Sequence, residues 1–253
     1  MKKFVLAGFI FLGSFGTAFG WGARGHKIVA QIARQYIDKS VMDSIDAYLD
    51  DITFEKASYW MDEVKMNINY DFMLPWHFVS IEADKTYVRG KTPDIVVVLE
   101  KTINTLKNKK TTSSKETLLS LKVLIHLVAD IHNPVNCGFV KDRNGKNVKL
   151  RFFFKSTTLH DVWEDEILEY QKLTAEDCLK LAGVMHKNDI VRYQKTDVLK
   201  WMEESRSLLS TVYDYKGAKL DDAYVDKAVP VIKMQLLKAG LRLAAVLNQT
   251  FSK

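Results

Sequence analysis

The chain has 253 residues, of which 47% are hydrophobic and 27% charged, and its formal net charge is +6. Two cysteines, Cys137 and Cys178, allow at most one disulfide bond, so the composition excludes a disulfide-rich scaffold. Whether these two cysteines pair stays open. The excess of positive charge is small and spread along the chain, so it suits an anionic substrate without requiring one.

The first twenty residues have the features of a secretory signal peptide. They begin with Lys2 and Lys3, continue as a short apolar run, and end in small residues that include Ala18 and Gly20. The run is shorter than the ~20 apolar residues that a spanning helix needs. We therefore predict cleavage after Gly20, which makes Trp21 the mature N-terminus and the protein secreted or periplasmic. An uncleaved membrane anchor is the alternative.

Removal of residues 1–20 leaves 233 residues and takes away two lysines, so the net charge falls from +6 to +4. That length fits one large domain over residues 21–253. The mature sequence has no second apolar segment long enough to cross a membrane, and no repeats or linkers. We expect a soluble monomer without stable membrane association.

Most of the mature sequence has the three- and four-residue apolar spacing of amphipathic helices. Pro93 is expected in the first turn of one helix, and Pro230 is a candidate kink in the last. The exception follows Asn144-Gly145, where a turn precedes residues that suit a short strand or hairpin. The predicted fold is therefore an all-α, mostly helical single domain with a short β-hairpin. Helices are expected over residues 26–37, 93–106, 113–132, 157–170, 197–213 and 222–250.

Two histidine–carboxylate pairs stand out among the six histidines. His126 and Asp130 are four residues apart, as are His160 and Glu164, so each pair projects from one helix face. An ionised aspartate in so apolar a helix is costly unless it is paired or bound to metal. Imidazole and carboxylate at these spacings suit zinc, although a lone helical histidine is more often a structural residue.

Six short motifs then follow one another along the chain: "WGARGH", "WMD", "WHF", "HLVADIHNP", "DRNGKN" and "LHDVWE". In this order they resemble the S1/P1 nuclease family, to which the zinc-dependent phospholipases C are structurally related. The resemblance implies a mostly α-helical fold with a cluster of three zinc ions. It also implies cleavage of single-stranded DNA and RNA to 5′-nucleotides, with removal of 3′-phosphates as a second activity.

The resemblance assigns ligands for two zinc ions. The first set is Asp62, His77, His126 and Asp130. The second is the amine and carbonyl of Trp21, with His26 and the bridging Asp130. His132 is expected either to orient ligands or to be a plain structural histidine, and His186 matches no position of the pattern.

The third zinc site of this family is altered in this sequence. Its expected ligands are His160, Glu164 and Asn136, and Asn136 stands where the family has a histidine. Because a neutral amide oxygen is a poor zinc ligand, the third site is expected to be weakly filled, to hold another metal, or to be empty.

The resemblance also assigns roles around the metals. Asp62 would orient the attacking water, Lys65 would contact phosphate, and Phe78 would stack a nucleobase. For Lys65 the alternative is a solvated lysine, and for Phe78 it is a core residue. Ser80 replaces a carboxylate that reads the base in well-studied relatives. Hydrolysis of other phosphate esters, phospholipids included, and a catalytically impaired binding protein are the two alternative functions.

Overall fold

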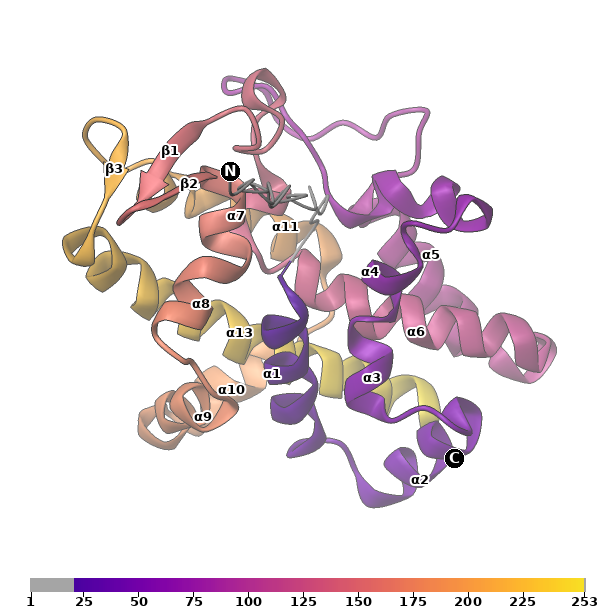
Figure 1. Ribbon diagram of the computed structural model, residues 1–253. Coiled ribbons are helices and arrows are strands. Elements are labelled where there is room, and N and C mark those ends of the chain that lie inside the picture. Colours follow the sequence, from indigo (N-terminus) through magenta and orange to yellow (C-terminus); the bar gives the residue numbers. More distant parts are fainter. Residues whose placement is uncertain (1–20, 253) are drawn as a thin grey trace, which may run out of the picture.

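The computed structural model describes residues 21–252, so the predicted signal peptide lies outside the described residues. The described chain is mostly helical, with one small sheet at its edge (Figure 1). The predicted mostly helical fold with a β-hairpin is therefore confirmed. The first half contains α1 Ala23–Arg34, α2 Lys39–Leu49, α3 Phe54–Ser58, α4 Trp60–Val64, the 3₁₀ helix η1 Ile68–His77, α5 Ile95–Lys107 and α6 Ser114–Asp130.

The second half begins with short elements and ends in the longest helix of the described chain. It contains the 3₁₀ turns η3 Pro134–Cys137 and η4 Val140–Asp142, then β1 Lys149–Phe152, β2 Lys155–Thr158, α7 Leu159–Asp161, the π-helical turn η5 Val162–Glu166, α8 Ile167–Tyr170, α9 Ala175–Val184, α10 Lys187–Tyr193, α11 Val198–Ser207, α12 Leu209–Val212, β3 Lys219–Leu220 and α13 Asp222–Phe251. The 3₁₀ turn η2 Lys109–Thr111 joins α5 to α6.

Side-chain caps explain where the central helices begin. The Ser113 hydroxyl accepts a hydrogen bond from the Glu116 amide at the start of α6, as the serine-and-acid start of this segment predicts. The carboxylate of Asp94 accepts the amides of Val96 and Val97 at the start of α5. Pro93 therefore lies before the N-cap, and its predicted place in the first turn is wrong.

Two other local predictions need correction. Residues 157–170 do not form one regular helix, because the turn η5 separates α7 from α8. The sheet has a third strand, since β3 pairs in parallel with β1 while β2 pairs with β1 antiparallel. A strand of two residues is too short to produce a detectable alternating pattern. Pro230 lies within α13, which continues through it as one helix.

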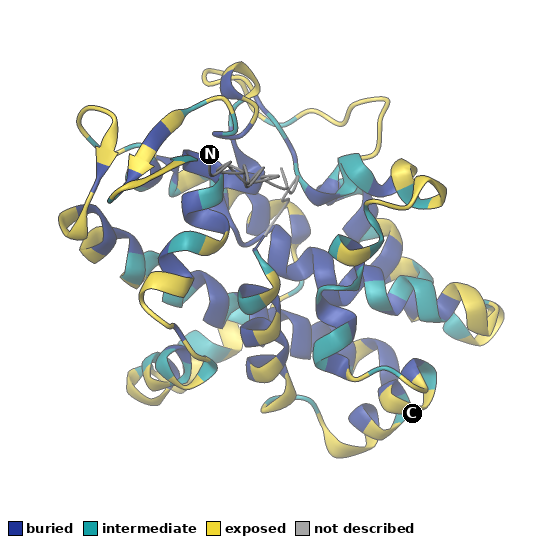
Figure 2. Cartoon of the chain, in the orientation of Figure 1, coloured by how far each residue is buried: buried dark blue, intermediate teal, exposed yellow. Residues whose placement is uncertain are grey.

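The core forms around α13, which packs against α1, α5, α6 and α9. Figure 2 shows buried residues concentrated where these helices meet and exposed residues at the outer helix ends. Within residues 21–252, no helix is long and apolar enough to cross a membrane. Cys137 and Cys178 are both buried and do not form a disulfide, which settles the pairing left open above.

The contact between α1 and α13 depends on a glycine and gives a first prediction. A Cβ at Gly240 would lie 2.4 Å from Ile32 Cγ2 and 3.2 Å from the Ala33 backbone nitrogen. Gly240→Ala should therefore lower the free energy of unfolding by about 1–3 kcal/mol, measured by urea denaturation.

The matched control is Gly183→Ala in α9, where an added Cβ meets nothing within 4 Å. This change should leave the stability unchanged or raise it by about 0.5–1 kcal/mol, because alanine is the better helix former. Equal stability of the two variants would contradict close packing of α1 on α13.

Candidate metal centre

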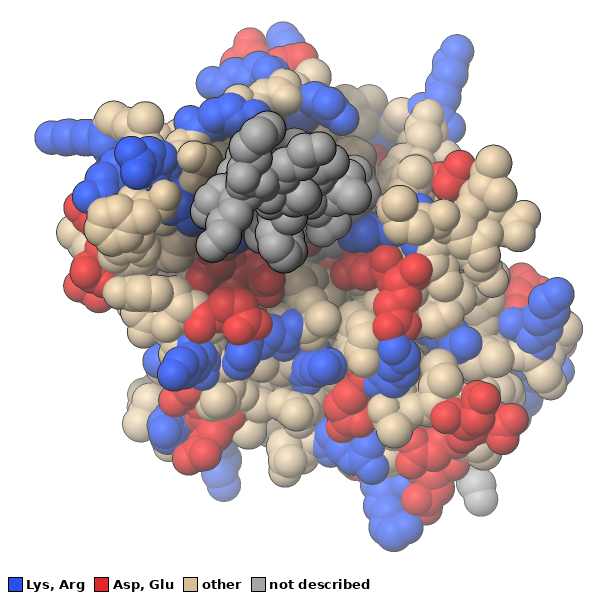
Figure 3. All heavy atoms as spheres, viewed as in Figure 1, with Lys and Arg blue, Asp and Glu red and all other residues tan. Residues whose placement is uncertain are grey.

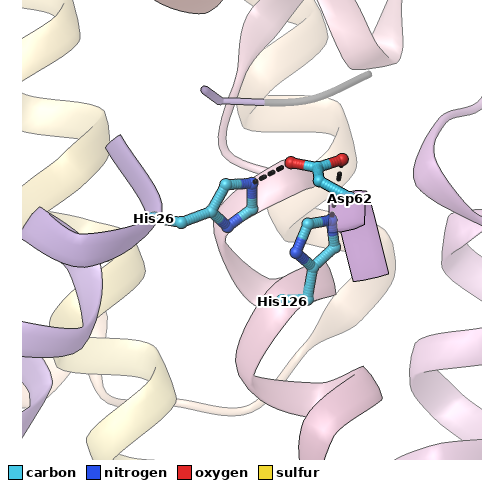
Figure 4. A group of neighbouring side chains, drawn as sticks. All are labelled: His26, Asp62 and His126. Carbon is cyan, nitrogen blue, oxygen red and sulfur yellow. Dashed lines mark ion pairs between the residues drawn. The ribbon is translucent and has the colours of Figure 1, made fainter. Parts of the chain in front are cut away.

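Four elements bring five of the proposed ligands together. His26 comes from α1, Asp62 from α4, His77 from the end of η1, and His126 and Asp130 from α6. Figure 4 shows how His26, Asp62 and His126 point toward one another from three of these elements. Positions 100 residues apart in the sequence thus meet in one cluster.

Asp130 lies at the centre of this cluster. Its Oδ2 is 2.9 Å from His77 Nδ1 and 3.1 Å from His126 Nε2, and its Oδ1 is 3.3 Å from His26 Nε2. Burial raises the pKa of the Asp130 carboxyl, but attraction to His126 and the close approach of the three imidazoles outweigh burial and hold it well below its usual range. Asp130 is therefore ionised, although its side chain is fully excluded from solvent.

The hydrogen bonds of His126 define which of its nitrogens can bind a metal. Its Nδ1 is 2.8 Å from the Ser58 carbonyl, which can only accept, so Nδ1 carries a proton. Nε2 then faces Asp130 Oδ2 and His77 Nδ1, which is 3.0 Å away. Burial lowers the pKa of His126, but Asp130 and Asp62 outweigh it and raise the pKa. A positive charge, either a proton or a metal ion, is therefore favoured beside Nε2.

His26 and Asp62 complete the cluster. The His26 ring stacks on His126 with 4.0 Å between centroids, and burial, reinforced by His126, lowers the pKa of His26. Neither ring nitrogen of His26 has a hydrogen-bond partner within residues 21–252. One oxygen of Asp62 lies 3.9 Å from His26 Nε2, and the other lies 3.9 Å from His126 Nε2. A neutral imidazole such as His26, facing carboxylates without a hydrogen bond, is typical of a metal centre.

The donor atoms form two overlapping groups, each spanning no more than 4.8 Å. This spacing is close to what ligands at about 2.0–2.2 Å from one shared zinc ion require. The residues present therefore fit metal ions, with His126 common to both groups. The groups are His26, Asp62 and His126, and His77, His126 and Asp130.

The Trp21 side chain is fully buried. A Cβ at Gly25 would lie 2.7 Å from Trp21 Cβ, so glycine at this position leaves room for the tryptophan. The next amide, of Gly22, donates a hydrogen bond to the Glu164 carbonyl at 3.0 Å. The chain therefore seats its expected mature N-terminus against the segment that carries Glu164.

The third expected site has unpartnered donors. His160 Nδ1 donates to the Asn144 carbonyl, which leaves a lone pair on Nε2, 3.7 Å from Glu164 Oε2. These two atoms and Asn136 Oδ1 are buried and lack hydrogen-bond partners in the described chain. Burial, with Lys146 nearby, lowers the pKa of His160 to about 3, and burial raises that of Glu164 well above its usual value. His160 and Glu164 fit a cation, whereas Asn136 offers only an amide oxygen.

His132 has a structural role, which decides between the two expectations. Its Nδ1 donates to the Val128 carbonyl at 2.7 Å, and its Nε2 accepts from Arg242 Nη1 at 2.8 Å. Arg242 in turn pairs with Glu204 at 2.6 Å. Both ring nitrogens of His132 are thus used in hydrogen bonds that hold the core together, and neither of these bonds involves a proposed metal ligand. His186, at the N-cap of α10, is exposed.

The remaining expected residues lie around the cluster. Lys65 Nζ is 3.4 Å from Asp62 Oδ1. Phe78 lines a pocket of about 220 Å³. Ser80 lines the same pocket and donates a hydrogen bond to Asn144 Oδ1 at 2.8 Å. Phe78 is therefore placed at a cavity wall rather than in the core, and it is only half-buried.

Two basic residues of this pocket were missed by the sequence reasoning. Lys146 is half-buried with its Nζ 5.8 Å from the Phe78 ring centroid, and burial lowers the pKa of its ammonium to about 8. Arg143 lines the pocket from the same loop. The motif "DRNGKN" contains both residues, but we interpreted it only as a turn and as one of the six motifs of the resemblance, without a role for either residue. The sequence signal that could have identified them is the pair of basic residues, Arg143 and Lys146, on either side of the turn at Asn144-Gly145.

A buried set of imidazoles and carboxylates within a helical domain is typical of metal-dependent hydrolases. The model of the S1/P1 nuclease family matches residues 21–252. The chain is 26% identical to Endonuclease 4 of Arabidopsis thaliana, over 93% of this chain and 90% of that protein. It is 25% identical to Nuclease S1 of Aspergillus oryzae, over 91% of both, and 21% identical to Nuclease P1 of Penicillium citrinum, over 90% and 97%.

The chain therefore belongs to the S1/P1 nuclease family, as its motifs predict. The family and the names of these relatives support a nuclease.

The contrast between His126 and His132 gives a second prediction. His126→Gln should lose most of the bound zinc, because His126 belongs to both ligand groups. His132→Gln should keep its zinc, but its free energy of unfolding should fall by about 1–3 kcal/mol, because Arg242 loses a buried partner. Elemental analysis and urea denaturation of both variants measure the two effects. Equal zinc content in the two variants would contradict the assignment of His126.

Proposed function

We propose that this protein is a secreted, zinc-dependent nuclease that cleaves single-stranded DNA or RNA to 5′-nucleotides, with 3′-nucleotidase activity as a second reaction. The observation that carries the proposal is the cluster around Asp130, where three imidazoles and two carboxylates converge. Zinc ions bound there would generate a nucleophile at neutral pH and neutralise charge on the phosphate. We further propose Trp21, His160, Glu164 and Asn136 as ligands beside this cluster.

Asp62 is the proposed group that orients the attacking water. Its side chain is 17% exposed, whereas the side chains of His26 and Asp130 are fully buried. A carboxylate at the solvent edge of the cluster can accept a proton from water while it also faces a metal ion. Lys65, 3.4 Å from this carboxylate, is close enough to contact a phosphate that the water attacks.

The surroundings of the cluster suit a single strand. Phe78 at the wall of its pocket offers a ring on which a base can stack. A larger pocket, of about 920 Å³, is lined by Lys149, Arg151 and Lys155 of the hairpin and also by four acidic residues, Asp161, Glu164, Asp165 and Glu166. In Figure 3, lysine and arginine side chains gather over the sheet side of this face. An aromatic platform beside basic side chains is the usual surface for single-stranded nucleic acid, and Phe78 lies with Arg143 and Lys146 at the smaller pocket.

We also propose that residues 1–20 are removed before the protein functions. The family match begins at Trp21, and the Trp21 side chain is fully buried. Cleavage after Gly20 would create an amine at Trp21, which could then serve as a metal ligand. The domain then runs from residue 21 to residue 253.

One observation favours a second candidate, hydrolysis of phospholipids or other phosphate esters with apolar groups. Between Lys65 and His77 the chain exposes Met66, Ile68 and Phe72. Apolar side chains beside a metal cluster could contact the apolar part of such a substrate. The nuclease remains the leading proposal because Phe78 and the two basic residues of its pocket, Arg143 and Lys146, favour nucleic acid.

The direct test is release of soluble nucleotides from single-stranded DNA by protein processed after Gly20. Zinc-loaded protein should release them, and a chelator should abolish the release. Asp62→Asn should lower kcat about 10²- to 10⁴-fold, because it removes the group that accepts the proton. The control is Glu63→Gln on the same helix, whose partner is Lys56 and which should keep full activity.

Three outcomes would contradict this proposal. Chelator-resistant release would remove zinc from the mechanism. Full activity of Asp62→Asn would remove Asp62 from it. Release of phosphorylated head groups from liposomes, without release of nucleotides, would favour the second candidate.

Asn136→His tests the third site. Restoring an imidazole there should raise the zinc content by about one equivalent per chain, because zinc binds imidazole more strongly than an amide oxygen. Elemental analysis checks this change, and nucleotide release shows whether the wild-type site limits activity. Unchanged zinc content would mean that Asn136 does not contact the third ion.

If the wild-type protein is inactive but Asn136→His cleaves DNA, the wild-type chain is a damaged nuclease. If both proteins are inactive, the chain is better explained as a protein that binds metal or nucleic acid without turnover.

A further inference from the structure

The loop before β1 holds three consecutive residues in the left-handed region. Arg143, Asn144 and Gly145 have φ values of 52°, 59° and 82°. For the two residues that carry a Cβ this conformation costs of order 1–3 kcal/mol each. Surrounding contacts hold the turn in place, since Asp142 accepts the Gly145 amide at 3.0 Å and the Tyr213 hydroxyl at 2.6 Å. This turn sets the position of the next residue, Lys146.

The same turn is fixed against His160. The Nδ1 of His160 donates to the Asn144 carbonyl at 2.9 Å, and the His160 amide donates to the Gly145 carbonyl at 3.4 Å. A Cβ at Gly145 would lie 3.2 Å from the His160 nitrogen. The backbone just before Lys146 is therefore held directly against a ligand candidate of the third site.

The side chain of Lys146 turns toward the substrate region. Its Nζ lies 5.8 Å from the centroid of the Phe78 ring, and both residues line the pocket of about 220 Å³. Among the charged groups that act on Lys146, Glu164 has the strongest effect and Lys65 the next. The ammonium is thus placed near the base platform, the third-site carboxylate and the other lysine of the cleft.

We propose that Lys146 binds a phosphate of the nucleotide whose base stacks on Phe78, on the side of the third metal site. This inference rests on the proposed function and adds a specific substrate contact to it. The physical reason is charge. Asn136 supplies neither a charge nor an imidazole, so a metal ion at the third site is held less firmly than by a full set of strong ligands. An ammonium fixed by the covalent chain neutralises phosphate without depending on that ion.

The test compares Lys146→Gln, which removes the charge at similar length, with Lys146→Arg, which keeps it. Lys141→Gln is the matched control, because Lys141 is exposed in the same loop and lines neither pocket beside the cluster. Zinc-loaded proteins are compared by calorimetric titration with inorganic phosphate, by KM and kcat on a short single-stranded oligonucleotide, and by zinc content.

Lys146→Gln should weaken phosphate binding and raise KM about 10- to 100-fold, with zinc content unchanged, because a charged hydrogen bond to phosphate is lost. Lys146→Arg should keep most of both affinities, and Lys141→Gln should equal the wild type. Unchanged phosphate affinity and KM in folded Lys146→Gln would overturn the proposal. So would loss of zinc from that variant, because Lys146 would then serve to balance Glu164.

The failure of this inference and the failure of the proposed function are distinguishable. If wild-type protein binds phosphate through Lys146 but cleaves no nucleic acid, the nuclease proposal fails and the phosphate site stands. If the wild-type protein cleaves DNA and Lys146→Gln has the same KM and the same phosphate affinity, only the proposed role of Lys146 is wrong.

Discussion

The fully buried carboxylate of Asp130 is the constraint on which the rest of the site depends. It lies within 3.3 Å of nitrogens from three histidines, and each of these comes from a different element. A buried charge is costly unless it is compensated, so α1, η1 and α6 must meet with their imidazoles directed at this one side chain. The close packing of α1 on α13 at Gly240 serves the same end, because α1 carries His26. The packing of the helices and the charge balance of the metal centre therefore depend on each other.

His126 and His132 show how the same residue type serves two purposes six positions apart. Both ring nitrogens of His132 have partners: Val128 accepts, Arg242 donates, and Glu204 balances Arg242. Around His126, one nitrogen is satisfied by Ser58 and the other faces a carboxylate and a second imidazole. A complete network stabilises the core by itself. An incomplete one is stabilised by a cation, and this difference separates structural histidines from ligand candidates better than burial does.

The sequence predicts the helices and the pairs within them, because the 3.6-residue period places residues i and i+4 on one face. The pair His126 and Asp130 follows from that rule alone. The meeting of His26, Asp62 and His77 with this pair depends on packing between distant elements, and only the family resemblance anticipated it. Lys146 was missed because its direction is decided by left-handed backbone at Asn144 and Gly145, which residue spacing does not reveal. The strand β3 was missed because two residues are too few to show the alternation of buried and exposed side chains that indicates a strand.

The π-helical turn η5 explains how the third site and the backbone beside Trp21 come to share one residue. In this turn the Ile167 amide donates to the Val162 carbonyl, five residues back instead of four. The carbonyl of Glu164, in the same turn, accepts the amide of Gly22, while its carboxylate faces His160. A Cβ at Gly22 would lie 2.5 Å from Asp165 Oδ1, so this approach requires glycine. Glu164 thus holds the backbone beside Trp21 with its main chain and offers a metal ligand with its side chain. An irregular turn at this point, where a regular helix was predicted, couples the position of the backbone beside Trp21 to the geometry of the third site.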